Sequence, residues 1–224
     1  MAVLVVADND NAHLRDTTHK TVTAALAMSG DVDVLVLGQG ADAAAAAAAK
    51  IDGVRKVILA ESADVGHGIA EAICDTIIGL AGGYDAVLVP ATSAGKNFAP
   101  RVAAKLDASP ISDVIEVVSA DTFVRPIYAG NALATVKSAD SVKVLTIRPT
   151  AFDKAETSGG SGAVEAVSCE GAGLSTWKSE QLSKSDRPEL ASAGTVVAGG
   201  RGLKSGENFK LVFDLAGTLE PSPP

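Results

Sequence analysis

The feature that most constrains the fold of this chain is the alternation of short apolar runs and helical patterns over residues 1–107. Each apolar run has the length of a buried strand and is followed by a segment with helical periodicity. Parallel strands need a crossover between them and are covered on both faces. The alternation therefore predicts a doubly wound, mostly parallel α/β sheet. The apolar runs are Val3–Ala7, Val32–Leu37, Val57–Ala60 and Ala86–Val89.

The segments between these runs carry recognisable helix signals. The first helix is predicted from Thr17 or Thr18, either of which can cap it, to Met28. The alanine-rich segment Ala43–Ala49 combines high helix propensity with side chains small enough to pack closely on a sheet. The clearest helical pattern covers Asp64–Ala81 as one helix. Its apolar stripe consists of Val65, Ile69, Ile73 and Ile77.

The turn after the fourth apolar run is a candidate ligand site. Residues Ala91–Asn97 are mostly small or hydroxylated, and they lie where a strand's carboxyl end meets the helix Phe98–Asp107. Open α/β sheets usually bind ligands at such positions, and Lys96 would supply the charge for an anion. The same residues are equally compatible with an ordinary helix start capped by Ser93.

From Ser109 the pattern changes to short β-like runs separated by tight turns. Such a succession is typical of antiparallel strands, here predicted as an antiparallel extension of the sheet. With the preceding strands and helices, these runs define a predicted nucleotide-binding-like domain of residues 1–150. The runs are Val114–Val118, Phe123–Tyr128, Ala132–Val136 and Val142–Ile147.

Residues 151–190 are predicted to form a linker and connector. Ser158–Gly162 contains only serine and glycine, a composition typical of flexible linkers. Val164–Val167 is a candidate for one further strand, and Trp177–Glu189 is polar and charged.

The segment 194–216 reads as a strand, a glycine-rich turn and an amphipathic helix. A buried strand is expected at Thr195–Ala198, and the turn that follows would place free backbone N–H groups where they suit a phosphate. Arg201 adds a planar donor fork for an anion. A glycine-rich corner without a ligand is the alternative. One strand and one helix cannot bury their own faces, so residues 191–224 are predicted to begin a second domain, with exposed apolar surface over Phe209–Leu215.

Composition excludes several functional classes. The net charge of −8 and the aromatic content of 4% argue against nucleic-acid binding. Two cysteines and three scattered histidines give no metal-ligand spacing, and no motif for bond-making catalysis occurs. No run has the pattern of a signal peptide or the length of a membrane span, so a cytoplasmic location without direct membrane insertion is expected.

Several long motifs resemble the electron transfer flavoprotein alpha subunit, and the resemblance extends from residue 1 to about Ala216. They are Ser93-Ala94-Gly95-Lys96-Asn97, Pro100-Arg101-Val102-Ala103-Ala104, Pro110-Ile111-Ser112-Asp113, Asp121-Thr122-Phe123-Val124-Arg125-Pro126-Ile127-Tyr128-Ala129-Gly130-Asn131-Ala132 and Val197-Ala198-Gly199-Gly200-Arg201-Gly202-Leu203-Lys204-Ser205-Gly206-Glu207-Asn208-Phe209.

The resemblance implies a heterodimer with a beta subunit and one FAD held by the second domain. Such a protein carries electrons from acyl-CoA and related dehydrogenases to a quinone oxidoreductase and converts no substrate itself. Arg201 is the residue carried over as a flavin contact, where a cation favours the anionic reduced forms. Gly200 and Gly202 would let the backbone approach the cofactor closely.

The chain also departs from the family. The continuation Gly217–Pro224 does not match, and the family's later FAD-domain motifs do not occur. The expectation is a truncated alpha subunit with an incomplete FAD site. Two alternatives stay open. One is a flavin-free interaction module that pairs with a beta subunit. The other is a regulator that binds an adenine nucleotide at Gly38–Gly40 and Ser93–Asn97.

Overall fold

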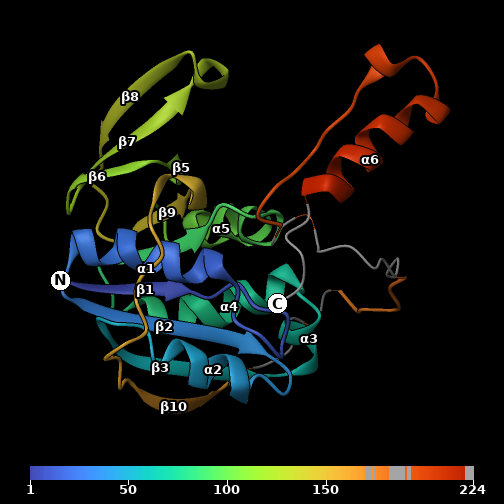
Figure 1. The fold of residues 1–224 in the computed structure, drawn as a ribbon. Helices are drawn as coiled ribbons and strands as arrows, with labels where there is room; N and C mark the ends of the chain where they lie inside the picture. Colours follow the sequence, from blue (N-terminus) through green and yellow to red (C-terminus); the bar gives the residue numbers. More distant parts are fainter. Residues whose placement is uncertain (170–172, 174, 182–189, 191–192, 220–224) are drawn as a thin grey trace. The chain divides into compact units, whose positions relative to one another are not determined.

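The computed structural model describes residues 1–169, 173, 175–181, 190 and 193–219 (Figure 1). It divides the chain into two units, Met1–Ser179 and Glu180–Pro224, called unit 1 and unit 2 below. None of the helices in the described ranges is long and apolar enough to cross a membrane.

Unit 1 is built on a seven-stranded sheet in which every neighbouring pair runs parallel (Figure 1). The strand order is β10-β3-β2-β1-β4-β9-β5, with β1 near the middle. The predicted α/β class with a mostly parallel sheet is therefore confirmed. The strands are β1 Ala2–Val6, β2 Asp31–Gly38, β3 Val54–Glu61, β4 Ala86–Pro90, β5 Ile111–Val114, β9 Lys143–Ile147 and β10 Ala163–Ser168.

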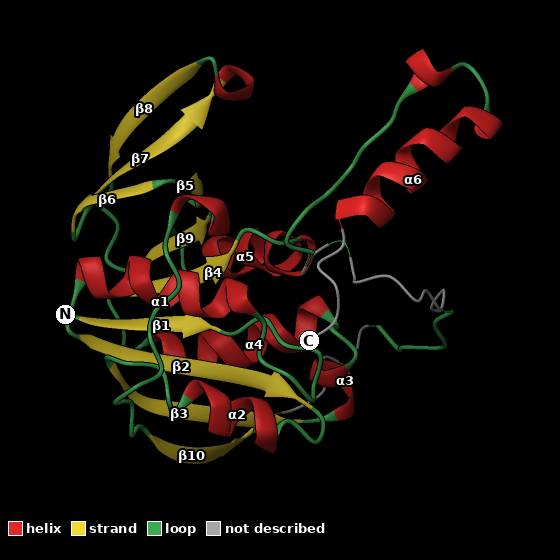
Figure 2. Ribbon diagram, in the orientation of Figure 1, coloured by secondary structure: helices red, strands yellow, loops and turns green. Residues whose placement is uncertain are grey.

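Helices cover both faces of this sheet (Figure 2). Successive strand residues point to opposite faces, so β1 feeds two separate cores. Val3 and Val5 pack with α1 and α2, whereas Leu4 and Val6 pack with α4 and α5, and all four valine and leucine side chains are buried. The helices are α1 Asp16–Met28, α2 Asp42–Ala48, α3 Ala63–Gly66, α4 Ala70–Ala81 and α5 Ser93–Lys105.

A second, smaller sheet in unit 1 contains the antiparallel strands. It consists of β6 Glu116–Ser119, β7 Thr122–Ile127 and β8 Ala132–Lys137, in the order β6-β7-β8. These strands form a sheet of their own, while β5 and β9 on either side of them in sequence join the central sheet as parallel strands. Phe123 of β7 is fully buried in the core that α1 covers, which anchors the small sheet to the body of unit 1.

The prediction of one helix over Asp64–Ala81 was wrong, because the helix is interrupted. α3 ends at Gly66, and Gly68 adopts a positive φ of 72°, a conformation that favours glycine and cannot continue an α-helix. α4 then starts at Ala70. The stripe of apolar residues masked the break, since Val65 and Ile73 still reach the same core from two separate helices.

Residues 151–169 pack within unit 1, although their composition favours a linker. The backbone N–H of Asp52 donates to the Glu156 carbonyl at 2.8 Å, and the N–H of Gly162 donates to the Ala49 carbonyl at 3.0 Å. A Cβ on Gly160 would collide with the backbone of Lys50, so this glycine permits close packing. The predicted strand at Val164–Val167 is confirmed as part of β10, which pairs with β3. Composition does not reveal such backbone partners.

A buried carboxylate ties three strands together near the amino ends of β2 and β3. Asp33 of β2 is fully buried, and Arg55 of β3 donates to it through Nε at 2.9 Å and through Nη2 at 2.7 Å. The Tyr84 hydroxyl, just before β4, donates to the same carboxylate at 2.7 Å. Burial alone would raise the pKa of Asp33, but the hydrogen bonds from Arg55 and Tyr84 outweigh it and hold that pKa below its ordinary value.

Replacing this carboxylate should destabilise the protein. Asp33→Asn keeps the size of the side chain but removes the charge that Arg55 and Tyr84 hydrogen-bond, and we expect a loss of about 2 kcal/mol in the free energy of unfolding. Urea unfolding measures it. Asp31→Asn, on the exposed start of the same strand, is the control and should change stability by less than about 0.5 kcal/mol. Equal effects of the two substitutions would contradict the assignment.

The same carboxylate predicts a pH dependence. Because the folded pKa of Asp33 lies below its unfolded value, its contribution is fully present above the ordinary aspartate pKa and is lost as pH falls through the folded value. The stability difference between wild type and Asp33→Asn should therefore be constant near neutral pH and shrink below about pH 4. Unfolding curves recorded over that range test this, and a difference that grows on acidification would refute it.

Candidate functional site

The carboxyl edge of the central sheet contains a crevice between β1 and β4. The chain winds from β1 to β2 and β3 on one side and places β4 on the other, so the connections leave β1 and β4 in opposite directions. Ligands in open α/β sheets bind at such a switch point. A pocket of about 110 Å³ lies here, lined by residues that follow β1, such as Ala7 and Asp8, and residues that follow β4, such as Thr92 and Gly95. We call it the switch-point crevice.

Two asparagine side chains fill part of the switch-point crevice. Asn9 Nδ2 donates to the Leu37 carbonyl at 3.1 Å, and Asn11 Nδ2 donates to the Gly66 carbonyl at 3.1 Å. Asn11 Oδ1 also accepts from the backbone N–H of Gln39 at 2.9 Å. These bonds connect the loops after β1 and β2 with α3. Asn11 has a positive φ of 71°, which asparagine tolerates better than most residues.

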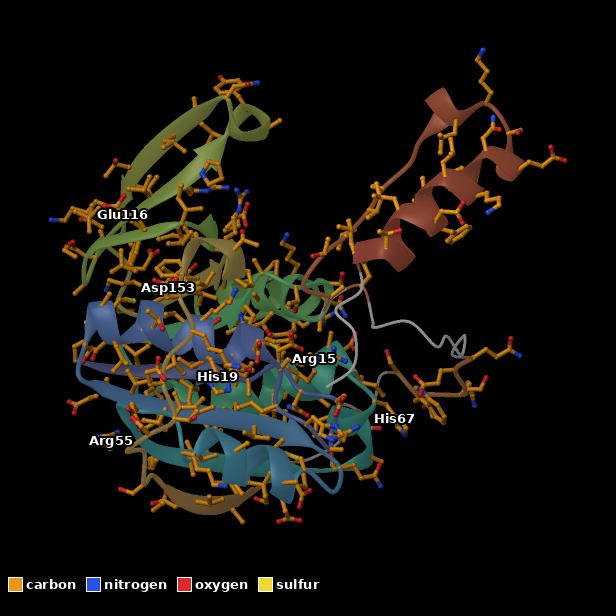
Figure 3. All side chains as sticks on the ribbon, viewed as in Figure 1. Arg15, His19, Arg55, His67, Glu116 and Asp153 are labelled. Carbon is orange, nitrogen blue, oxygen red and sulfur yellow. The ribbon has the colours of Figure 1, made fainter. Side chains whose placement is uncertain are left out.

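The acidic residue at the crevice is also engaged by its own chain. The Thr17 hydroxyl donates to Asp8 Oδ2 at 2.8 Å, and Arg15 Nε lies 3.9 Å from Asp8 Oδ1. The backbone N–H of Asp8 donates to the Thr18 hydroxyl at 2.9 Å. Arg15 is labelled in Figure 3 and lies near the carboxyl edge of the sheet, at the start of α1. Asp8 therefore holds the first turn of α1 against the end of β1.

The start of α5 forms the opposite wall of the crevice. Its N-cap is Thr92, whose hydroxyl accepts from the Gly95 N–H at 3.3 Å, so the predicted cap at Ser93 was off by one residue. A Cβ on Gly95 would collide with the Pro90 carbonyl oxygen, so only glycine allows the helix to begin this close to β4. Lys96 lies in this first turn, and its charge is among those that lower the pKa of Asp113, after the larger effect of Arg148.

The size of the crevice limits what it can hold. Pockets for cofactor-sized molecules usually enclose about 300 Å³ or more, whereas this one encloses about 110 Å³. Ser93–Asn97 forms the start of α5 instead of the predicted turn before the helix, and it lies at the predicted edge of the sheet, but the space beside it suits water or a small ion. Asp8, Asn9 and Asn11 also line the crevice. In the sequence, the signal for them was the polar run Asp8–Asn11 directly after the first predicted strand.

The second candidate site lies in unit 2, on the turn with three glycines. The expected strand Thr195–Ala198 was wrong: among the described residues of unit 2 no strand partner is present, and Thr195, Val196 and Ala198 are exposed. An isolated strand has no ladder to join, which is why the backbone here stays irregular. The turn itself forms a 3₁₀ helix, Arg201–Leu203.

The three predicted flavin contacts lie together on this turn. Arg201 is exposed, and the structure gives its side chain no hydrogen bond or ion pair with another described residue. A Cβ on Gly200 or Gly202 would meet nothing within 4 Å, whereas one on Gly199 would lie 2.5 Å from Leu203 Cδ1. Gly199 thus packs against its own unit, and Gly200 and Gly202 leave the backbone open to an outside group.

The helix that follows is amphipathic, and its Val212 lies beside the glycine turn, with Cγ2 2.9 Å from the position that a Cβ on Gly199 would take. It begins as a 3₁₀ turn over Gly206–Phe209 and continues as α6, Lys210–Leu219. The prediction of exposed apolar surface is confirmed: Leu211 is 68% exposed, Phe213 55% and Leu215 50%. The described residues hold no group of three or more side chains placed to bind a metal ion.

Comparison with known proteins gives a consistent result. The family profile described as an electron transfer flavoprotein domain matches residues 3–170. The chain is 53% identical over 220 residues to the electron transfer flavoprotein subunit alpha of Pseudomonas aeruginosa, which covers 98% of this chain and 71% of that protein. The Paracoccus denitrificans protein of the same name is 50% identical with the same coverage. A mitochondrial subunit alpha from Dictyostelium discoideum is 45% identical over 233 residues, 96% of this chain and 66% of that protein.

The close start of α5 makes Gly95 sensitive to substitution. Gly95→Ala should push the first turn of α5 off β4 and cost about 2 kcal/mol or more in the free energy of unfolding. Gly79→Ala is the matched control, because Gly79 is an exposed glycine inside α4 with nothing within 4 Å of a new Cβ. It should stabilise the protein by about 0.5–1 kcal/mol. Thermal and urea unfolding of both variants checks this, and a neutral Gly95→Ala would show that the contact is not tight.

Proposed function

Because this chain belongs to the electron transfer flavoprotein family, with the alpha subunits as its relatives, we propose that it is the alpha subunit of a heterodimeric electron carrier. The observation that carries the proposal is sequence identity. About half of the residues are identical to those of the Pseudomonas aeruginosa subunit alpha in an alignment that covers 98% of the chain. The aligned part includes the glycine turn of unit 2. An electron carrier needs to hold a redox cofactor and to dock partners, and no acid–base or nucleophilic machinery is required of it.

The cofactor in this proposal is FAD. When bound, FAD would supply the capacity to accept and release electrons one or two at a time. The residues of the glycine turn fit an anionic group in their chemistry: Arg201 offers an exposed donor fork, and Gly200 and Gly202 leave the backbone accessible. In our proposal Arg201 holds the negative charge of the flavin or its pyrophosphate, and the two glycines allow close approach. Residues 191–224 would then begin the FAD-binding domain.

The partners are proposed on the same basis. A beta subunit would complete the carrier, and residues 1–150 would contribute the subunit interface. Acyl-CoA dehydrogenases would deliver the electrons and a quinone oxidoreductase would receive them, in fatty acid oxidation. A cytoplasmic location belongs to the proposal as well.

A flavin-free interaction module is the second candidate. It is favoured by the packing of unit 1, whose two cores consist, as far as the residues are described, of side chains of unit 1 itself. Arg201 and its neighbouring glycines are exposed, so the turn alone would enclose little of a flavin. On this reading the chain pairs with a beta subunit but binds FAD weakly by itself.

An absorption spectrum distinguishes the two candidates. We expect the chain purified alone to be colourless, and titration with excess FAD to show no stoichiometric binding. Co-expression with a beta subunit should give a complex with a flavin spectrum if the chain is an electron carrier. A colourless complex would support the interaction module, and failure to form any complex would overturn both candidates.

The role of Arg201 is tested in the same complex. Arg201→Ala removes a charge-assisted contact and should weaken FAD retention about tenfold or more. Lys204→Gln is the matched control, since it removes a cation from the same turn and keeps an unbranched side chain of similar length on the same backbone. Equal losses in both variants would mean that general charge, and not a specific contact, holds the flavin.

A further inference from the structure

The loop between α3 and α4 makes an aromatic contact with a segment far away in the sequence. The rings of His67 and Trp177 stack with centroids 4.0 Å apart and planes inclined by 6°. His67 is labelled in Figure 3, in the loop that follows α3. Trp177 is the single tryptophan of the chain and lies two residues before Ser179, where unit 1 ends.

The histidine side of this stack is firmly placed. The backbone N–H of His67 donates to the Ala63 carbonyl at 2.9 Å, which closes the last turn of α3. Its neighbour Gly66 accepts a hydrogen bond from Asn11 Nδ2 at 3.1 Å. The ring of His67 is exposed while its backbone is fixed on both sides. It therefore presents a planar surface at a defined position on unit 1.

The tryptophan side has little else to hold it. Residues 175–181 form neither helix nor strand, and the structure gives them no hydrogen bond or ion pair with another described residue. Trp177 is 38% exposed. Within the described part of the chain, the ring stack is thus the specific contact that attaches this segment to the body of unit 1.

The strength of such a stack is modest. Aromatic pairs favour the closed arrangement by about two- to tenfold over the open one. Both arrangements are therefore populated, and small changes at either ring shift the balance between them. A chain segment held by one contact of this strength opens and closes readily.

We propose that His67 and Trp177 form a latch that fixes the connector at the end of unit 1. With the latch closed, residues 175–179 are held beside the loop that follows α3. With the latch open, this segment is released and becomes accessible to solvent and to proteases. The latch does not depend on flavin or on a beta subunit.

The single tryptophan makes the latch directly measurable in the full-length chain. His67→Ala removes the stacking partner from an exposed position, so the fold should stay intact. We expect the quenching of Trp177 fluorescence by acrylamide to increase, because the indole face becomes accessible. We also expect trypsin to cleave after the adjacent Lys178 about two- to tenfold faster, because cleavage follows the population of the open state.

Two control variants separate stacking from other effects. His67→Phe keeps a planar ring and should retain both the protected fluorescence and the slow cleavage. His13→Ala removes another exposed histidine, whose side chain is 83% exposed, and should change neither measurement. The proposal is overturned if His67→Ala behaves like wild type in both measurements, or if His67→Phe behaves like His67→Ala.

Discussion

The structure of unit 1 depends on one constraint, namely that a parallel sheet must be covered on both faces. Strand β1 meets this constraint most completely, because Val3 and Val5 enter one core while Leu4 and Val6 enter the other. Because β1 lies between β2 and β4 and runs parallel to both, the loops that follow these three strands lie at the same edge of the sheet. The switch-point crevice and the start of α5 beside it follow from that placement. The small sheet packs on this body through the buried Phe123, and residues 151–169 join it through backbone hydrogen bonds and the pairing of β10 with β3.

Much of the central sheet could be predicted from the sequence, because strands buried on both faces leave uninterrupted apolar runs. The four runs before residue 91 each correspond to a strand, and the alanine-rich segment is α2. Interruptions of a pattern were harder to see. Gly68 breaks a helix without disturbing the apolar stripe, and Thr92 caps α5 where the neighbouring serine is an equally good cap by type. Long-range pairing was also invisible, since β5 and β9 join the central sheet around three strands that do not.

The candidate sites, like the fold, could be predicted from the sequence only in part. The place of Ser93–Asn97 at the carboxyl end of β4 was predictable from the small and hydroxylated residues that follow the fourth apolar run. The amide groups of Asn9 and Asn11 at the same edge could be recognised only once three loops were seen together. In unit 2 the amphipathic helix was predictable from spacing, and so was its exposed face. The strand before it was not formed, because strand formation depends on partners and not on the segment's own composition. Arg201 with Gly200 and Gly202 remains a prediction carried over from the family.

The asparagine bridges of the switch-point crevice have a consequence for any ligand large enough to displace them. The side-chain amides of Asn9 and Asn11 are already paired within the chain, and no buried side-chain nitrogen or oxygen among the described residues lacks a partner. Such a ligand must break the bonds that Asn9 and Asn11 donate to the Leu37 and Gly66 carbonyls, and the bond that Asn11 accepts from the Gln39 N–H, before it forms its own. At about 1 kcal/mol for each of these bonds, the apparent affinity falls roughly a hundredfold below the intrinsic value. The side chains of Asn9 and Asn11 thus already bind the backbone groups with which a ligand would have to compete.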